Sequence, residues 1–164
     1  VMDFIFNKHA NDNSFGLKGR TYSSLIKASN EWHKDMHFKK FGDKNYSWDP
    51  FPIAKWSWKD KEEHCNWIVE QLTTSKELYA EGRRMRHCVA SYADSCRRGK
   101  SFIFSVRKHD GINAAESAVT IELTGDRQIV QARGKLNKNP AGRADLAMRK
   151  WMADNGLVYR RWYW

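Results

Sequence analysis

The chain has 164 residues, of which 29 are Lys or Arg and 19 are Asp or Glu, so its formal net charge is +10. A chain of this length can bury its own core, so we expect a single domain over residues 1–164, and the opening at Val1 is compatible with excision from a longer protein. No apolar run approaches the ~18 residues of a membrane span, which argues against a helical membrane protein.

The basic charge predicts a polyanionic partner, most simply nucleic acid, with DNA and RNA both open. The alternative is a basic protein without such a partner. Three cysteines form no paired spacing, which argues against a disulfide framework and favours the reducing cytoplasm.

The chain opens with an apolar stretch and a polar stretch, and residues 1–18 are expected to form a strand or arm followed by a loop. A helix is predicted from Tyr22 to Lys40, because apolar residues recur there every three or four positions. That apolar stripe consists of Leu25, Ala28, Trp32 and Met36.

His33 and His37 stand one turn apart on the neighbouring face of this helix. Such a pair can bind zinc. Two histidines without obvious third and fourth ligands are more often polar surface, so we expect neither a metal nor a cofactor.

The segment Phe41–Lys59 contains Gly, Pro and several Trp residues and is expected to be irregular chain. Its tryptophans either fill the core or stack on nucleobases. A second helix is predicted over Asp60–Leu72, with Trp67, Ile68 and Leu72 facing inward.

The central stretch Glu81–Tyr92 combines a basic run with histidine, cysteine and tyrosine. A capping box at Thr74 and Glu77 predicts the start of a helix before it, and Gly82 predicts the end of that helix. A second short helix is expected over Val89–Arg98, ended by Gly99. This arrangement places His87 and Cys88 at a helix N-terminus, which favours a thiolate or a bound anion.

Alternating apolar residues predict strands over Ser101–Arg107, Ser117–Thr124 and Gln128–Gly134. The last two are expected to pair through a two-residue turn at Gly125-Asp126. In that register Ile121 opposes Val130, Val119 opposes Ala132 and Thr120 opposes Gln131, and the polar face of the hairpin carries Thr120, Glu122, Gln131 and Arg133. A solvated outer face is the simplest explanation of this polar set.

A last helix is predicted over Ala141–Asn155, ended by Gly156 and followed by an edge strand or tail from Leu157 to Trp164. Its inward side chains are expected to be Leu146, Ala147 or Met148, and Trp151. The expected fold class is α+β, with a helical N-terminal half packed on a small antiparallel sheet of three or four strands and a C-terminal helix.

The motifs L-Y-A-E-G-R-R-M-R-H-C-V-A-S-Y, G-K-S-F-I-F-S-V-R, T-I-E-L and Q-A-R-G-K-L-N-K-N-P follow one another from Leu78 to Pro140. In order and spacing they resemble the PcfJ-like family of conjugative plasmids, phages and related mobile elements. The resemblance covers roughly Ser24 to Gly156 and includes Trp32-His33 and Trp151. It implies a genetic context and no particular reaction.

Two clusters of basic residues predict a phosphate-binding groove if the fold brings them together. The first flanks the two short helices and the second follows the last hairpin strand. The candidate nucleic-acid-binding residues are Arg83, Arg84, Arg86, Arg97, Arg98, Lys100, Arg133, Lys135 and Lys138.

A second hypothesis is a metal-independent nuclease or other nucleotide-directed enzyme centred on His87. Its candidate catalytic residues are His87, Cys88, Tyr92, Glu122, Gln131, Arg133 and Asn137. The hypothesis requires that His87 cover the polar face of the hairpin, within hydrogen-bonding reach of Glu122, Gln131 or Arg133. Burial in the core explains Cys88 equally well.

A third hypothesis is a protein-interaction module of a conjugation or phage assembly, in which the basic surface meets an acidic protein partner and the terminal aromatic residues form the interface.

Overall fold

The computed structural model describes residues 1–12, 14–41 and 45–160, and all of their side chains except those of residues 3 and 33–41. The chain divides into two compact units, residues 1–44 and residues 45–164. Among the helices described, none combines the length and the apolar character that crossing a bilayer requires.

The first unit consists of α1 (Met2–Asn11) and α2 (Tyr22–Phe41). The strand or arm expected near the N-terminus is wrong, because these residues form a helix. Phe4 of this helix is buried between the rings of Phe15 and Trp32, with centroid distances of 5.7 and 5.8 Å. The helix predicted from Tyr22 to Lys40 is confirmed as α2. The side chains of His33 and His37 lie outside the described part of the chain.

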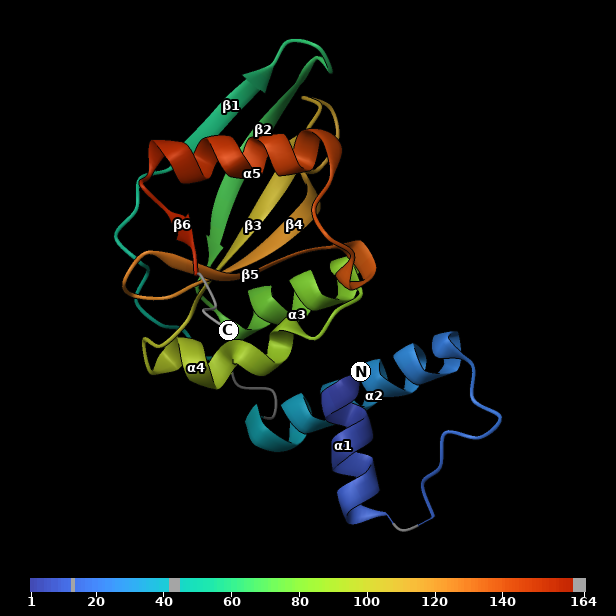
Figure 1. Cartoon of the computed structure of the whole chain (residues 1–164). Helices are drawn as coiled ribbons and strands as arrows, with labels where there is room; N and C mark the ends of the chain where they lie inside the picture. Colours follow the sequence, from blue (N-terminus) through green and yellow to red (C-terminus); the bar gives the residue numbers. More distant parts are fainter. Residues whose placement is uncertain (13, 42–44, 161–164) are drawn as a thin grey trace. The chain divides into compact units, whose positions relative to one another are not determined.

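The second unit is built on one curled sheet of six strands in the order β1-β2-β3-β4-β5-β6 (Figure 1). Neighbouring strands are antiparallel except β5 and β6, which are parallel. The strands are β1 (Trp56–Asp60), β2 (Cys65–Leu72), β3 (Phe102–His109), β4 (Glu116–Leu123), β5 (Gln128–Gly134) and β6 (Val158–Tyr159). The expected sheet of three or four strands, all antiparallel, is wrong.

The predicted number of strands is too low because β1 and β2 were not expected. β1 lies in the segment predicted as irregular chain, and β2 lies in the segment predicted as a helix. In β2, Cys65, Trp67 and Val69 are buried at alternate positions, which is the two-residue period of a strand. Ile68 and Leu72 add a four-residue spacing that imitates a helix. Burial of alternate residues against the core outweighs that local pattern, as is common for β-propensity.

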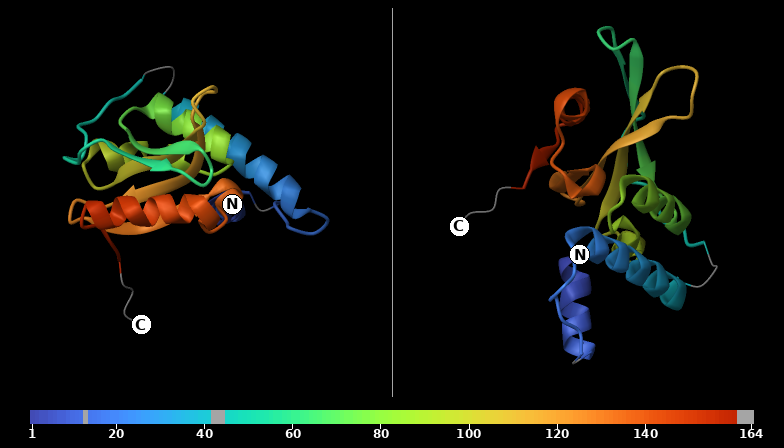
Figure 2. Two further views of the ribbon diagram at one scale, coloured as in Figure 1. Left: turned by 90° about the horizontal axis from the view of Figure 1, so that it is seen from above. Right: turned by 90° about the vertical axis from the view of Figure 1, so that its right-hand side faces the viewer.

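Helices cover both faces of the sheet (Figures 1 and 2). On one face α5 (Gly142–Asp154) places Trp151 against Phe104, with a centroid distance of 5.0 Å. On the other face lie α3 (Ser75–Met85), η1 (Val89–Tyr92) and α4 (Ala93–Arg97). Ala147, Met148 and Trp151 are buried as predicted, whereas Leu146 is 37% exposed and its predicted inward position is wrong.

The β4–β5 hairpin has a register two residues away from the predicted one. Arg127 adopts a left-handed conformation (φ 63°), so the loop has three residues instead of two, and a bulge lies between Glu122 and Leu123. Thr120 therefore opposes Arg133 and Glu122 opposes Gln131. Because the shift is even, the polar residues keep their predicted face.

The start of α3 is the predicted capping box. The Glu77 amide donates to Thr74 Oγ1 at 3.2 Å, and the Thr74 amide donates to Glu77 Oε2 at 3.0 Å. The predicted end at Gly82 is wrong, because the helix continues to Met85 and Arg86 adopts the left-handed conformation that reverses the chain (φ 54°).

Gly82 serves instead as a point of close approach. The His87 amide donates to the Gly82 carbonyl at 3.1 Å, and a Cβ on Gly82 would lie 2.9 Å from the His87 carbonyl oxygen. The chain can fold back over the helix only because this side chain is missing. The expected helix after the turn is confirmed as η1 and α4, followed by Gly99 at φ +64°.

We predict that Gly82→Ala lowers the free energy of unfolding by about 1 to 3 kcal/mol, because the new methyl group pushes against backbone that cannot easily move. Urea denaturation measures the change. Gly125→Ala is the matched control, since Gly125 has open space around it and no positive φ. An equal effect of the two substitutions would contradict the assigned role of Gly82.

Candidate functional site

A buried carboxylate, Glu81, lies between α3 and the sheet and accepts hydrogen bonds from two strands. Glu81 is 0% exposed. Its Oε1 accepts from Ser105 Oγ at 2.7 Å and from Thr120 Oγ1 at 2.9 Å, and its Oε2 accepts from Ser117 Oγ at 2.8 Å. These four residues together with His87 are called the Glu81 cluster below.

An irregularity in the sheet makes this convergence possible. Ser117 and Thr120 are three residues apart, so in a regular strand they would face opposite sides. The β3–β4 register shifts between Val106 and Arg107, so that Val106 pairs with Val119 and Arg107 pairs with Ser117. The extra residue in β4 turns Ser117 towards α3, beside Thr120.

Two guanidinium groups lie near the same carboxylate. Arg107 Nη2 is 3.7 Å from Glu81 Oε2, while its Nε donates to Ser105 Oγ at 3.1 Å and its Nη1 pairs with Glu70. Arg84 Nη1 is 3.6 Å from Glu81 Oε2, and its side chain is 51% exposed. The buried negative charge is thus met by three hydroxyl donors and two cations.

His87 completes the cluster and is 8% exposed. Its Nε2 lies 2.9 Å from Thr120 Oγ1. The single hydroxyl proton of Thr120 is donated to Glu81, so Nε2 carries a proton and donates to Thr120. Burial lowers the pKa of His87 below its ordinary value, although the nearby charge of Glu81 acts in the opposite direction. The imidazole is therefore neutral at pH 7 and linked to Glu81 through one hydroxyl.

Two of the other predicted catalytic residues, Glu122 and Arg133, belong to separate local contacts. His87 covers the polar face of the hairpin, but its partner there is Thr120. Glu122 accepts from Ser101 Oγ at 2.8 Å, and Arg133 donates to Asn139 Oδ1 at 2.9 Å.

Gln131 is half-buried opposite Glu122. Cys88 and Tyr92 are half-buried at the two ends of η1, and Asn137 is exposed in η2 (Lys135–Asn137).

A solvated outer face was the simplest explanation of the polar residues on the β4–β5 hairpin. That explanation is wrong for Thr120, which is 6% exposed beneath α3.

Ser105, Ser117 and Arg107 belong to this site but were not predicted from the sequence. The available signal was a serine at the inward position of an apolar strand. Ser105 lies between Phe104 and Val106 and is 0% exposed. A buried hydroxyl requires a partner, which in this structure is Glu81.

Eight of the nine predicted basic residues divide into two groups, whereas Arg133 is half-buried and donates to Asn139. Arg83, Arg84, Arg86, Lys135 and Lys138 are exposed, and η2 lies beside the C-terminal end of α3 (Figure 1). Arg97, Arg98 and Lys100 are exposed beyond the far end of α4, where Arg97 lies over the Tyr46 ring and Arg98 pairs with Asp94 at 3.0 Å. The structure therefore brings the first group together and separates it from the second.

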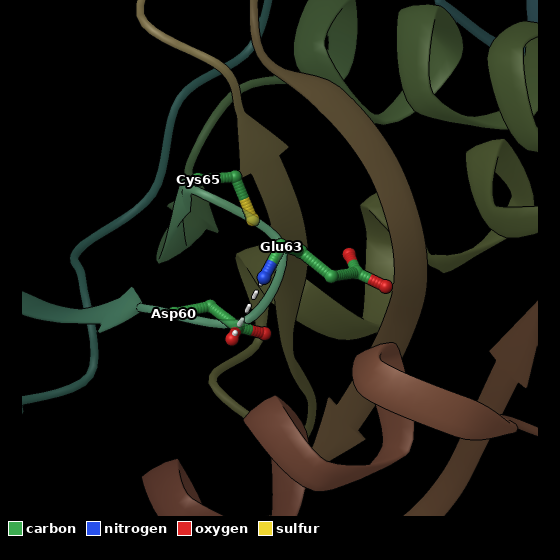
Figure 3. A group of neighbouring side chains, drawn as sticks. All are labelled: Asp60, Glu63 and Cys65. Atoms are coloured by element: carbon green, nitrogen blue, oxygen red, sulfur yellow. Dashed lines mark hydrogen bonds between the residues drawn. The ribbon is translucent and has the colours of Figure 1, made fainter.

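A group of potential metal ligands lies at the β1–β2 turn, where one ligand atom each of Asp60, Glu63 and Cys65 falls within 4.8 Å of the others (Figure 3). Both Asp60 oxygens already accept from protein donors. Arg143 binds both of them, and the Glu62 amide and the Trp67 indole add further bonds.

Arg143 lowers the pKa of Asp60 to about 2, while burial raises that of the Cys65 thiol. A carboxylate saturated by a guanidinium and a neutral thiol do not suit a metal ion. Asp60 instead forms an ion pair with Arg143, which holds α5 to the β1–β2 turn.

The fold and its site define a mixed α/β domain with a polar cluster buried beneath one helix and a basic surface at the end of that helix. The family model described as PcfJ-like protein matches residues 26–146, so the chain belongs to the PcfJ-like family, as the resemblance indicated. Comparison with curated proteins and with solved structures gave no match.

We predict that the protein loses stability as the pH falls below about 6.5, because the unfolded chain binds a proton that His87 in the folded state does not. The loss continues down to the lowered pKa of the folded state. Urea denaturation between about pH 7.5 and 5.5 measures the slope.

In His87→Gln this part of the slope should disappear, whereas in the control His64→Gln it should remain, since His64 is exposed. Equal slopes in the wild type and in His87→Gln would show that burial does not control the titration of His87.

Proposed function

We propose that this PcfJ-like domain binds nucleic acid through the surface formed by Arg83, Arg84, Arg86, Lys135 and Lys138, called the α3–η2 surface below. The observation that supports the proposal is that two basic segments about fifty residues apart in the sequence lie side by side with exposed cationic side chains. Such a surface attracts phosphates irrespective of base sequence.

The η2 turn has a backbone suited to contact with a ligand. Leu136 and Asn137 both adopt left-handed conformations (φ 61° each), which non-glycine residues rarely do. Strained backbone of this kind is concentrated at functional sites. The turn is held by the Gly134 amide, which donates to the Lys138 carbonyl at 2.8 Å, so Lys135 and Lys138 project from a fixed loop.

The proposed cellular setting of this function is the cytoplasm, and its proposed genetic context is a mobile element. No disulfide links Cys65, Cys88 or Cys96 among the described residues, which suits a reducing cytoplasm. Family membership favours a protein of a plasmid, phage or other mobile element, where DNA and RNA are both plausible ligands. The domain would then act on the nucleic acid of the element or on its transcripts.

We predict that the logarithm of the affinity for a 20-nucleotide single strand falls linearly with the logarithm of salt concentration, and that Arg83→Ala/Lys135→Ala/Lys138→Ala reduces the slope by about two to three. Fluorescence anisotropy with labelled DNA and RNA, single-stranded and double-stranded, measures both quantities. The panel also decides which nucleic acid binds most tightly.

The control Lys55→Ala/Lys59→Ala/Lys61→Ala removes the same charge from exposed positions near the β1–β2 hairpin. Its slope should change by less than one, because those residues lie outside the α3–η2 surface. Binding that is weak and indifferent to salt, or that falls equally in both variants, would refute the proposal.

A second candidate function is a nuclease centred on His87, and the observation that favours it is the hydrogen-bonded chain from His87 through Thr120 to Glu81. A neutral imidazole can accept a proton, and a carboxylate linked to it stabilises the imidazolium that results. His87 is enclosed, so a substrate would have to reach its other ring nitrogen.

If the domain is such a nuclease, we expect cleavage of at least one nucleic acid in the presence of EDTA, and His87→Ala should abolish that cleavage. Gel analysis of DNA and RNA substrates provides the measurement. His64→Ala is the control for loss of an exposed imidazole. Cleavage that survives in His87→Ala, or no cleavage of any substrate, would exclude this function.

A further inference from the structure

The edge of the sheet between β1 and α3 contains a gap in strand pairing. β1 pairs with β2 only as far as Trp56 opposite Val69, whereas β2 continues to Leu72. The edge is covered again at Thr74, which bridges to Ser47. Between these points, Glu70, Gln71 and Leu72 have a described strand neighbour on the β3 side only.

The segment before β1 does not pair with this edge of the sheet, and its own residues explain why. The segment before β1 contains Pro50 and Pro52, which have no amide proton to donate to a neighbouring strand. Phe51 instead turns into the core, where its ring lies 4.9 Å from that of Phe102. The departure of this segment leaves an open cavity of about 1180 Å³ along the edge.

Polar groups of β2 face this cavity. The Thr73 carbonyl points away from β3, because it accepts from the Trp48 amide at 3.0 Å in the segment that covers the edge at Thr74. Backbone groups alternate in direction along a strand, so the amide and carbonyl of Gln71 point to the same side. Gln71 lines the cavity, and its buried side-chain amide nitrogen has no hydrogen-bond partner in the described part of the chain.

The two walls of the cavity differ in chemistry. On the α5 side the lining includes Phe51, Phe104 and Trp151, which belong to the core. On the α3 side it includes Lys76, Arg84 and Arg107.

The carboxylates on the α3 side already have partners. Glu70 pairs with Arg107, and Glu77 accepts from the amides of Thr73 and Thr74. Lys55 and Lys76 line the cavity and have no ion pair among the described residues. The net charge left for a ligand is positive.

We infer that this cavity binds an extended segment of a partner protein in which apolar and acidic residues alternate. Such a segment would extend the sheet at Gln71, with successive side chains facing the apolar wall and the cationic wall in turn. A nucleotide fits less well, because Phe51 is buried and the Trp56 indole is held by Asp154 at 2.7 Å, so neither ring is free to stack on a base.

The test uses the full chain and three labelled hexapeptides in fluorescence anisotropy. The first alternates glutamate and valine, the second alternates lysine and valine, and the third is the first with N-methylated backbone amides. The glutamate peptide should bind saturably, and each of the other two should bind at least about tenfold more weakly, because one lacks the complementary charge and the other lacks amide donors.

Lys55→Glu/Lys76→Glu should weaken binding of the glutamate peptide by about tenfold, and the control Lys59→Glu/Lys61→Glu should leave it unchanged. Ala80→Phe, which fills the cavity from α3, should also weaken it, and thermal denaturation checks that this variant folds.

The inference fails if no peptide saturates, if the N-methylated peptide binds equally well, or if the two lysine variants behave alike. The outcome is independent of the proposed function, because Lys55→Glu/Lys76→Glu leaves the α3–η2 surface intact. If this variant lost no peptide affinity but lost nucleic-acid binding relative to its control, the cavity would instead be a nucleic-acid site.

Discussion

The arrangement of α3 against the sheet depends on the burial of one carboxylate. Removing a carboxylate from water costs several kcal/mol, so Glu81 is tolerated only where donors replace its hydration. Ser105, Ser117 and Thr120 supply these donors, and Arg84 and Arg107 supply positive charge. A shift of α3, or a change in register between β3 and β4, would leave the charge without partners. The cluster therefore specifies one position of the helix.

The same constraint organises the surface around it. Because Glu81 fixes α3, the exposed arginines two to five residues later are held beside η2. The chain then turns back over Gly82 and brings His87 to Thr120, which already belongs to the cluster. The proposed nucleic-acid surface and the alternative His87 site are thus two sides of one helix end. The proposed peptide cavity lies along the same helix, lined by Ala80 and Arg84.

Much of the candidate site could be predicted where the signal lay in residues close together in the sequence. The capping box at Thr74 and the polar face of the hairpin follow from residue spacing. The polar face survived an incorrect turn because the register error was even. The partners of His87 could not be predicted in the same way. Thr120 was one of several polar residues on that face, and only the bulge in β4, which no local pattern indicates, brings Ser117 beside it.

The sequence by itself determined the periodic elements that follow from nearest neighbours, among them α2, the start of α3, strands β3 to β5, and α5 with its buried Trp151. It also indicated the family and the basic character of the chain. Tertiary structure alone decided that residues 56–72 form two strands, because the apolar residues of that segment satisfy a helical and a strand period equally well. It also decided that Glu81 is buried, since a glutamate after a capping box resembles a solvated helix residue until strands distant in sequence supply its hydrogen-bond donors.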